Sequence, residues 1–303
     1  NKVLGLGYNA IKDKIYVDLS VCISTDKKNE KVKLSLDSLM HYQIRNCLTK
    51  SNILGIINDI YDPIGLASPI TIKLRVGFRN LFQADSTLGW NDPIPMKDVQ
   101  DNWLALIKSL VEAEKVGFPR ATTPSNAIGK PQLICYFDGS DVAYAAAIYI
   151  RWVLSDQTVK VSLLSSKAHV TPLNRISTPR SELNGAVLAS RLLLSSLKCL
   201  SACNHLPERA WMIGDSECTL SSLEKVNSAF GEYFGNRIGE IVNLQANIEK
   251  YCPIGNDGEW WHTASNNNAA DRATRIDSEI IDIAEGSEWQ NGLSYLKLPP
   301  SDW

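Results

Sequence analysis

The pattern of apolar and polar positions changes near residue 132 and divides the chain into two parts. In the first part, apolar residues recur at helical spacing over residues 50–61, 69–83 and about 97–114, which predicts three helices. Residues 2–22 precede them and predict a β-hairpin, because apolar residues alternate with polar ones in its second strand. The first part is therefore expected to be a small, mainly helical domain with an N-terminal hairpin.

The second part follows a different order of elements. From Gln132 onward the pattern predicts three strands, a long helix, a strand, helices, a further strand and a last helix. The first two strands are the run Leu133 to Phe137 and the run Ala143 to Ile150, with a Gly-Ser turn between them. The long helix begins after Ser177, Thr178 and Pro179, which are typical helix-start residues. This order predicts an α/β domain.

The expected domain boundaries follow from proline, glycine and length. Pro and Gly residues gather between residues 118 and 131, which predicts a linker over 121–131. The expected domains are then residues 1–120 and 132–285, the latter ending in a helix near Glu285, with 286–303 as a loose tail. A chain of 303 residues with 44% hydrophobic residues is long and apolar enough for two domains with real cores.

The composition indicates in which cellular compartment the protein is expected. The sequence holds no run of 18 apolar residues and no basic-then-apolar start, so neither membrane insertion nor secretion is expected. It begins in mid-pattern at Asn1, as a fragment or a processed piece of a polyprotein would. Seven scattered cysteines favour reduced thiols in an intracellular protein. Cys199, Cys203 and His205 lack a second ligand pair at zinc-site spacing and are interpreted as a helix end.

Four acidic residues of the second part stand out by their positions. Asp138 ends the first strand, and Asp215 follows the later strand Ala210 to Ile213. Glu182 opens the long helix, and Asp271 begins a short helix after three asparagines. Any one of them alone is ordinarily a turn former or a helix cap. Open sheets place ligands at the carboxyl ends of strands, so the sheet can bring all four together.

The chemistry of this set points to metal. Carboxylates are the ligands that hard ions such as Mg²⁺ or Mn²⁺ select, whereas soft metals prefer thiolate or imidazole. Two such ions about 3.5–4 Å apart can activate a water and stabilise the leaving oxygen of a phosphoryl displacement. The order Asp, Glu, Asp, Asp on these elements therefore favours a site for two divalent metals.

Basic residues form two groups, although the net charge of the chain is −2. Affinity for nucleic acid depends on local rather than total charge. The first group precedes Glu182 and is expected to contact phosphate: Lys167, His169, Arg175 and Arg180. The second lies on one predicted helix, where a solvated face and a backbone contact both remain open: Lys73, Arg75 and Arg79.

Several motifs together resemble one known family. They are the D-G-S turn, P-R-S-E-L-N-G-A, G-D-S-E and W-W-H-T-A-S-N-N-N-A-A-D-R-A-T-R. The set resembles the ribonuclease H domain of Pol polyproteins in BEL/Pao long-terminal-repeat retrotransposons. Residues 3–7 and 52–69 resemble the segments that follow the reverse-transcriptase palm and join it to ribonuclease H. The resemblance implies a ribonuclease H-like mixed five-stranded sheet with flanking helices, preceded by a connection or thumb-like domain.

The resemblance also implies an activity. It is hydrolysis of the RNA strand of RNA·DNA hybrids by two Mg²⁺ or Mn²⁺ ions, leaving a 3′-hydroxyl and a 5′-phosphate. Asp138 would bridge both ions, Glu182 and Asp215 would complete the ion near the leaving oxygen, and Asp215 or Asp271 would hold the ion that activates water. The implied partners are the hybrid and the polymerase domain of the same polyprotein, with no membrane. The implied location is a cytoplasmic virus-like particle or the nucleus.

Residues beside the carboxylates are candidates for substrate contact. Ser140, Ser181 and Asn184 could contact 2′-hydroxyls or phosphates, and they are equally expected as turn and cap residues. Many ribonucleases H carry a mobile His before the last aspartate, but the loop Thr263 to Asn268 contains none. His262 precedes that loop at the end of a predicted strand and is interpreted as a structural or substrate-flanking residue.

Other functions remain to be weighed. A domesticated, inactive nucleic-acid-binding fold would keep the core pattern and lose ligands. An aspartic peptidase needs Asp-Thr/Ser-Gly, whereas residues 138–140 read Asp-Gly-Ser. An integrase orders its triad Asp, Asp, Glu, and a polymerase needs the second aspartate that Tyr16-Val17-Asp18-Leu19 lacks. Residues 1–120 carry no carboxylate set and are expected to clamp a duplex or pack against a polymerase domain.

Overall fold

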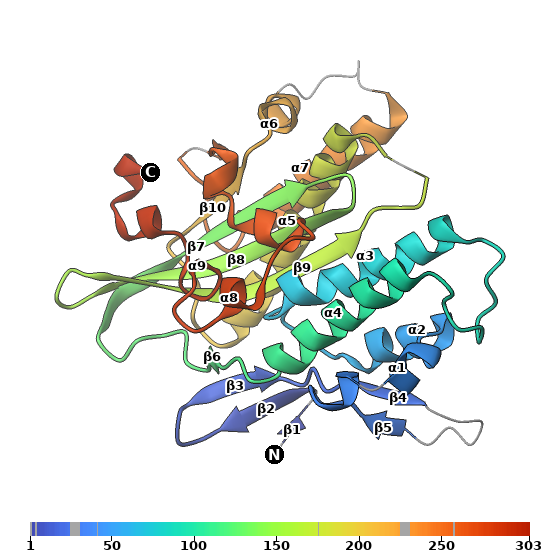
Figure 1. Cartoon of the computed structure of the whole chain (residues 1–303). Coiled ribbons are helices and arrows are strands. Elements are labelled where there is room, and N and C mark those ends of the chain that lie inside the picture. Colours follow the sequence, from blue (N-terminus) through green and yellow to red (C-terminus); the bar gives the residue numbers. More distant parts are fainter. Residues whose placement is uncertain are drawn as a thin grey trace. The chain divides into compact units, whose positions relative to one another are not determined.

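The computed structural model describes residues 2–3, 5–24, 31–40, 42–174, 176–224, 231–256 and 258–303. The chain forms two compact units. Figure 1 shows the helices and strands of the whole chain, coloured along the sequence from blue to red. Unit 1 comprises Asn1–Pro63, Ala67–Arg120 and Ile276–Glu285. Unit 2 comprises Ile64–Leu66, Ala121–Arg275 and Gly286–Trp303.

Unit 1 combines short strands with three longer helices. Its strands are β1 (Lys2–Val3), β2 (Leu6–Asn9), β3 (Lys14–Val17), β4 (Cys22–Ser24), β5 (Lys31–Lys33) and β6 (Phe118–Pro119). Its helices are η1 (Ser38–Met40), α1 (Tyr42–Asn46), α2 (Lys50–Asp59), α3 (Ser68–Ala84), α4 (Lys97–Ala113) and α8 (Ile280–Ile283). The strands pair as β1-β2-β3-β6 and β4-β5. The three predicted helices are confirmed as α2, α3 and α4.

The predicted N-terminal hairpin is present as β2 and β3, but its second strand ends earlier than the alternation suggested. The Asp18 carboxylate accepts hydrogen bonds from the backbone N–H and the hydroxyl of Ser20, at 3.3 and 2.8 Å. Such a local side-chain turn competes with the strand ladder for backbone donors. The alternating apolar residues beyond Val17 are buried without extending the strand.

Unit 2 is built on one mixed sheet. Its strands are β7 (Ala127–Gly139), β8 (Ala143–Leu154), β9 (Val159–Val170), β10 (Arg209–Gly214) and β11 (Trp261–His262), in the order β11-β10-β7-β8-β9. β7, β8 and β9 are antiparallel, whereas β10 is parallel to β7 and β11. The expected five-stranded mixed sheet is therefore confirmed for the described residues.

The helices of unit 2 are one long core helix and shorter pieces. They are α5 (Thr178–Ala202), α6 (Glu217–Glu224), α7 (Glu232–Ile248), α9 (Glu288–Asn291), η2 (Ser265–Asn267), η3 (Ala269–Ala273), η4 (Ser294–Lys297) and η5 (Pro300–Asp302). α5 packs against β7, β8 and α7. By length and composition alone α5 is the one described helix that could cross a membrane, yet its apolar residues Leu183, Leu193 and Leu197 are buried in the core of unit 2.

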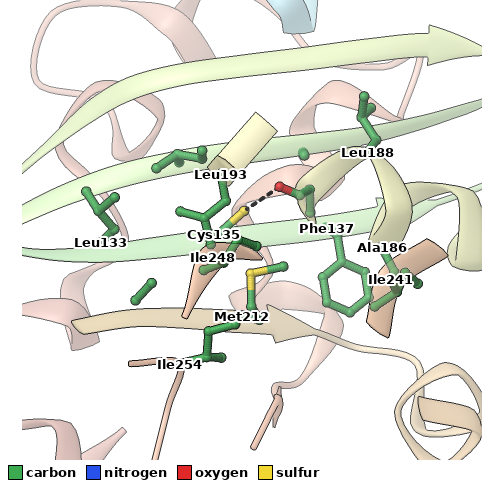
Figure 2. Packing of buried hydrophobic residues seen from close by; sticks show 14 of the residues in the cluster. Leu133, Cys135, Phe137, Ala186, Leu188, Leu193, Met212, Ile241, Ile248 and Ile254 are labelled. Carbon is green, nitrogen blue, oxygen red and sulfur yellow. Dashed lines mark hydrogen bonds between the residues drawn. The ribbon is translucent and has the colours of Figure 1, made fainter. Parts of the chain in front are cut away.

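Alternation along β7 sends neighbouring side chains to opposite faces of the sheet. Leu133, Cys135 and Phe137 lie in the cluster formed with α5 and α7, as Figure 2 shows. Tyr136 instead contacts Tyr295 of the C-terminal segment through the two hydroxyls. By the same alternation, Asp138 belongs to the face of Tyr136.

Residues 286–303 are not the loose tail that the sequence suggested. Trp289 and Leu296 are fully buried. The Trp289 indole donates to the Leu66 carbonyl at 2.7 Å, and the Arg151 guanidinium donates to the carbonyls of Leu296 and Leu298 at 2.8 and 3.0 Å. The segment is part of unit 2. Before it, the expected helix to Glu285 is only α8, which belongs to unit 1.

The predicted linker over 121–131 is shorter in the structure. β7 begins at Ala127 and therefore contains Gly129 and Pro131. The register of β7 against β8 shifts between Ile128 and Gln132. Glycine and proline are tolerated at such an irregularity, because it leaves backbone groups outside the ladder.

Candidate active site

Two of the four acidic residues lie at neighbouring strand ends. Asp138 is the second-last residue of β7, and Asp215 directly follows β10. The two strands are parallel, and Ile213 is in register with Tyr136. Their carboxyl ends therefore meet at one edge of the sheet, as the sequence predicted.

Glu182 reaches the same edge because two glycines let α5 approach β7. A Cβ atom on Gly139 would lie 2.3 Å from the Glu182 backbone nitrogen, and one on Gly185 would lie 2.5 Å from the Asp138 carbonyl oxygen. No real side chain fits at those distances, so larger residues would push the helix away. The close contact places Glu182, in the second turn of α5, beside the end of β7.

Asp271 is carried by η3, which begins after the N-cap Asn268. The element following the asparagines is thus a 3₁₀-helix in the predicted place. Thr274 ends it and donates its hydroxyl to the Asp138 carboxylate. The helix of the last aspartate is therefore tied directly to the end of β7.

Protein donors engage all four carboxylates. The Arg275 guanidinium donates to Asp271 at 2.6 Å, and the Asn268 amide donates to Asp215 at 3.1 Å. Glu182 accepts from the Thr219 hydroxyl at 3.5 Å, a long contact. Together with the bond from Thr274, these contacts orient each acid.

The acids also act on one another through their charges. Burial raises the pKa of Asp138 to about 7; the Thr274 hydrogen bond opposes this rise, and the negative charges of Asp215 and Asp271 add to it. The pKa of Glu182 is raised mainly by burial, with a further contribution from Asp215 and an opposing hydrogen bond from Ser216. The four side chains form one electrostatic group.

This group fits a hard cation by its chemistry. Carboxylate oxygens are what Mg²⁺ and Mn²⁺ take as ligands. Burial raises the pKa of Asp138 most, and a cation would offset the further rise caused by the charges of Asp215 and Asp271. Over the described ranges, however, no three acidic, histidine or cysteine side chains are arranged around one ion position. Metal binding would therefore require the acidic side chains to come closer together around the ion. Each carboxylate has two oxygens and can accept its protein donor and bind a cation at the same time.

The three predicted polar neighbours have different surroundings. The Ser140 hydroxyl lies within hydrogen-bond distance of the Ala143 carbonyl, as in a turn residue, and also of the distant Thr274 carbonyl. Ser181 was expected to contact substrate as one alternative, but it is fully buried, so a duplex cannot reach its hydroxyl in this conformation. Asn184 is half-buried and accepts a hydrogen bond from Tyr233 at 2.9 Å.

The predicted basic residues do not all gather at this edge. Arg180 is exposed two residues before Glu182, and its guanidinium stands 4.8 Å from the centre of the Tyr233 ring. Lys167 is exposed on β9. It pairs with Ala146 of β8, which pairs with Phe137 of β7, and paired residues point to the same face of the sheet. Lys167 therefore lies on the face that α5 covers, opposite to Asp138. Arg175 lies outside the described residues.

The remaining basic and histidine candidates contact other groups of the protein. His169 stacks on Tyr144, with ring centres 5.6 Å apart. In unit 1, Lys73 donates its ammonium group to the Ser278 carbonyl, which argues against a free phosphate-binding role for that side chain. His262 ends β11, as predicted, is exposed, and has Nε2 3.2 Å from the Asp215 carbonyl oxygen.

Sequence reasoning missed the partners of the carboxylates. No orienting role was predicted for Asn268, Thr274 or Arg275. Asn268 was placed only as one of three asparagines before a short helix, and the other two only within a motif. Their spacing from Asp271 carries a signal: the first is a helix-cap position, and the others lie three and four residues later, on the same helical side. The bond from Thr274 to Asp138 and the bond from Asn268 to Asp215 are long-range and need the sheet, whereas Arg275 binds Asp271 four residues before it.

The strand order, the long helix on one face and the acidic edge define an α/β protein of the ribonuclease H-like class. The family described as Pao retrotransposon-like RNaseH-like domain matches residues 49–211, more than half of the chain. The chain belongs to this family. The matched range includes Asp138 and Glu182, whereas Asp215 and Asp271 lie beyond it and are placed by the geometry above.

Several solved structures are similar to the chain at low levels. The N-terminal RNase H domain of rv2228c from Mycobacterium tuberculosis is 13% identical, with a TM-score of 0.30, over 48% of this chain and 91% of that chain. RNase H1 from the halophilic archaeon Halobacterium salinarum is 12% identical, with a TM-score of 0.28, over 47% and 91%. LC11-RNase H1 in complex with an RNA/DNA hybrid is 12% identical, with a TM-score of 0.30, over 48% and 93%. No curated protein matches the chain.

Proposed function

We propose that the chain is a ribonuclease H that hydrolyses the RNA strand of RNA·DNA hybrids with two divalent cations, Mg²⁺ or Mn²⁺. One observation carries the proposal: four carboxylates from four separate elements lie at one edge of the sheet and influence one another's charge. A cluster of acids with one member buried and three half-buried is costly for folding and is typical of a functional site. Family membership supports the same reading.

The proposed ligands are Asp138, Glu182, Asp215 and Asp271. Two bound ions would supply an activated water and charge stabilisation of the leaving oxygen. The chain's own part is to hold the acids in place: Thr274 and Asn268 fix Asp138 and Asp215 at the strand ends, while the glycine contact fixes Glu182. Arg180, exposed at the start of α5, is a candidate for the substrate backbone.

The proposed setting is the reverse transcription of a Pao-type element. The matched family supports origin in a Pao-type retrotransposon. The Pol polyprotein, its polymerase domain as partner, and a cytoplasmic virus-like particle or the nucleus as location are parts of the proposal. The family match begins at Thr49, directly before α2, and so includes α2, α3 and α4 of unit 1. We propose that unit 1 is the connection to that polymerase.

The test is cleavage of a labelled RNA·DNA hybrid by the whole chain. Wild-type protein with Mg²⁺ or Mn²⁺ should cut the RNA strand, leave double-stranded DNA intact and lose activity in EDTA. Asp138→Asn should lower the rate at least about 100-fold, because it removes a charge from the proposed metal ligands. Glu208→Gln is a matched control, since it removes an exposed carboxylate of the same unit.

A second candidate is a binding module without catalysis. It is favoured by one observation: among the described residues, no three acidic, histidine or cysteine side chains are arranged around one ion position. Tight hybrid binding with no cleavage under either metal would establish this alternative and contradict the enzyme proposal.

A further inference from the structure

Asn268 is a buried polar residue at the acidic edge, and its side chain makes three hydrogen bonds. Its side chain is buried, with 3% exposed, although asparagine ordinarily lies at the surface. Its amide nitrogen donates to the Phe137 carbonyl at 2.8 Å and to the Asp215 carboxylate at 3.1 Å. Its amide oxygen accepts from the Ala270 backbone N–H at 3.1 Å. One short side chain therefore reaches three separate parts of the fold.

Those three parts carry three of the four acids. Phe137 precedes Asp138 on β7, one residue beyond the last pair that β7 makes with β10. Asp215 follows β10, and Ala270 precedes Asp271 on η3. The backbone carbonyl of Asn268 also accepts from the Asp271 N–H at 3.2 Å. Asn268 thus bridges the segments that hold Asp138, Asp215 and Asp271.

The chemistry of the site selects this residue type. Two acceptors, a carbonyl and a carboxylate, face the amide nitrogen, and one donor faces the amide oxygen, so the orientation of the amide is determined. An aspartate at position 268 would place a negative charge against the Phe137 carbonyl and the Asp215 carboxylate, and a serine there would be too short to reach both. Glutamine adds a methylene group in a buried space.

We infer that Asn268 is the positioning residue of the acidic site and sets the distances among Asp138, Asp215 and Asp271. The inference rests on the proposed function, in which those acids bind divalent cations. Asn268 touches no reacting atom; it acts through the acids that it orients. Residues that orient metal ligands typically change metal affinity or activity 10- to 100-fold when they are replaced, so an effect of about that size is expected.

The experiment compares two variants of the whole chain by Mn²⁺ titration calorimetry and by hybrid cleavage. Asn268→Ala removes every side-chain bond. Asn268→Ser keeps an oxygen able to cap η3 and removes both amide donors. Both variants should bind Mn²⁺ at least about 10-fold more weakly than wild type and should recover cleavage when Mn²⁺ is raised. Asn266→Ala, an exposed neighbour in the same run of asparagines, is the matched control.

Thermal unfolding in EDTA shows whether each metal-free variant is folded. A loss of Mn²⁺ affinity in a folded variant can then be assigned to the position of the acids. A residue that only caps η3 would show wild-type Mn²⁺ affinity in Asn268→Ser, and that result would overturn the inference. Equal affinity in wild type and both variants would overturn it as well. Failure of the wild-type chain to bind Mn²⁺ at all would instead contradict the proposed function, so the two failures are distinguishable.

Discussion

At the scale of single residues, burial decides the chemistry of Asp138. Only 8% of the residue is exposed, and its pKa rises from 3.8 to about 7. A folded-state pKa above the unfolded one means that the native protein binds the proton more tightly. Stability of the metal-free chain should therefore be highest below about pH 4 as far as this group is concerned, and should fall as pH rises toward 7.

Replacing Asp138 by Asn should stabilise the metal-free protein at pH 8. The shift corresponds to a few kcal/mol, at about 1.36 kcal/mol per pKa unit, and Asn removes this cost. The gain should shrink at pH 5, where the wild-type carboxyl is already protonated. Thermal unfolding in EDTA at both pH values measures it, with Glu208→Gln as the exposed control. A variant that is less stable than wild type at pH 8 would contradict the electrostatic account.

Single residues also show where sequence reasoning stopped. The four acids could be chosen from the sequence because each follows or opens an element with a clear pattern. The bonds from Thr274 to Asp138 and from Asn268 to Phe137 join residues more than 130 positions apart. No local pattern encodes such a contact, so the orienting residues and the burial of Ser181 needed the fold.

At the scale of elements, the contact between α5 and β7 determines where Glu182 lies. Gly185 faces the Asp138 carbonyl, where a Cβ would come within 2.5 Å. Gly239 on α7 is exposed, with open space at the corresponding position. The two helical glycines are thus a matched pair for testing whether the close approach matters.

Gly185→Ala should destabilise the chain by about 1–3 kcal/mol, because the added methyl forces the helix or the strand to move. Gly239→Ala should stabilise it by about 0.5–1 kcal/mol, since alanine is the better helix former. Urea denaturation measures both free energies of unfolding. Equal stability of the two variants would show that α5 tolerates displacement from β7.

Elements with a regular period could be predicted, and those without one could not. The helices α2 to α5 and the strands β7 to β10 follow from recurring apolar positions. The segment Gly286–Trp303 has no such period, because it is anchored by isolated residues such as Trp289 and Leu296 within short helical turns. Its burial depends on partners such as Leu66 and Arg151, which lie far away in the sequence.

At the scale of the whole molecule, total charge is a poor guide to hybrid binding. The chain carries 31 basic and 33 acidic residues, and several of the acids gather at one edge, where cations would neutralise them. Affinity for a duplex then depends on which basic groups lie beside that edge. Arg180 and Lys198 both lie exposed on α5, near opposite ends of the helix.

These two residues test whether hybrid affinity depends on the charge beside the acidic edge or on the net charge of the chain. They are separated by 18 residues of helix at about 1.5 Å each, which is about 27 Å. Arg180→Ala should weaken hybrid binding several-fold at low salt and reduce the slope of log affinity against log salt by about one. Lys198→Ala removes the same charge and should leave affinity and slope unchanged. Fluorescence anisotropy with a labelled hybrid, over a salt series with Ca²⁺ replacing Mg²⁺ to prevent cleavage, gives both quantities. Equal losses in the two variants would mean that the field of the whole molecule, rather than the start of α5, attracts the duplex.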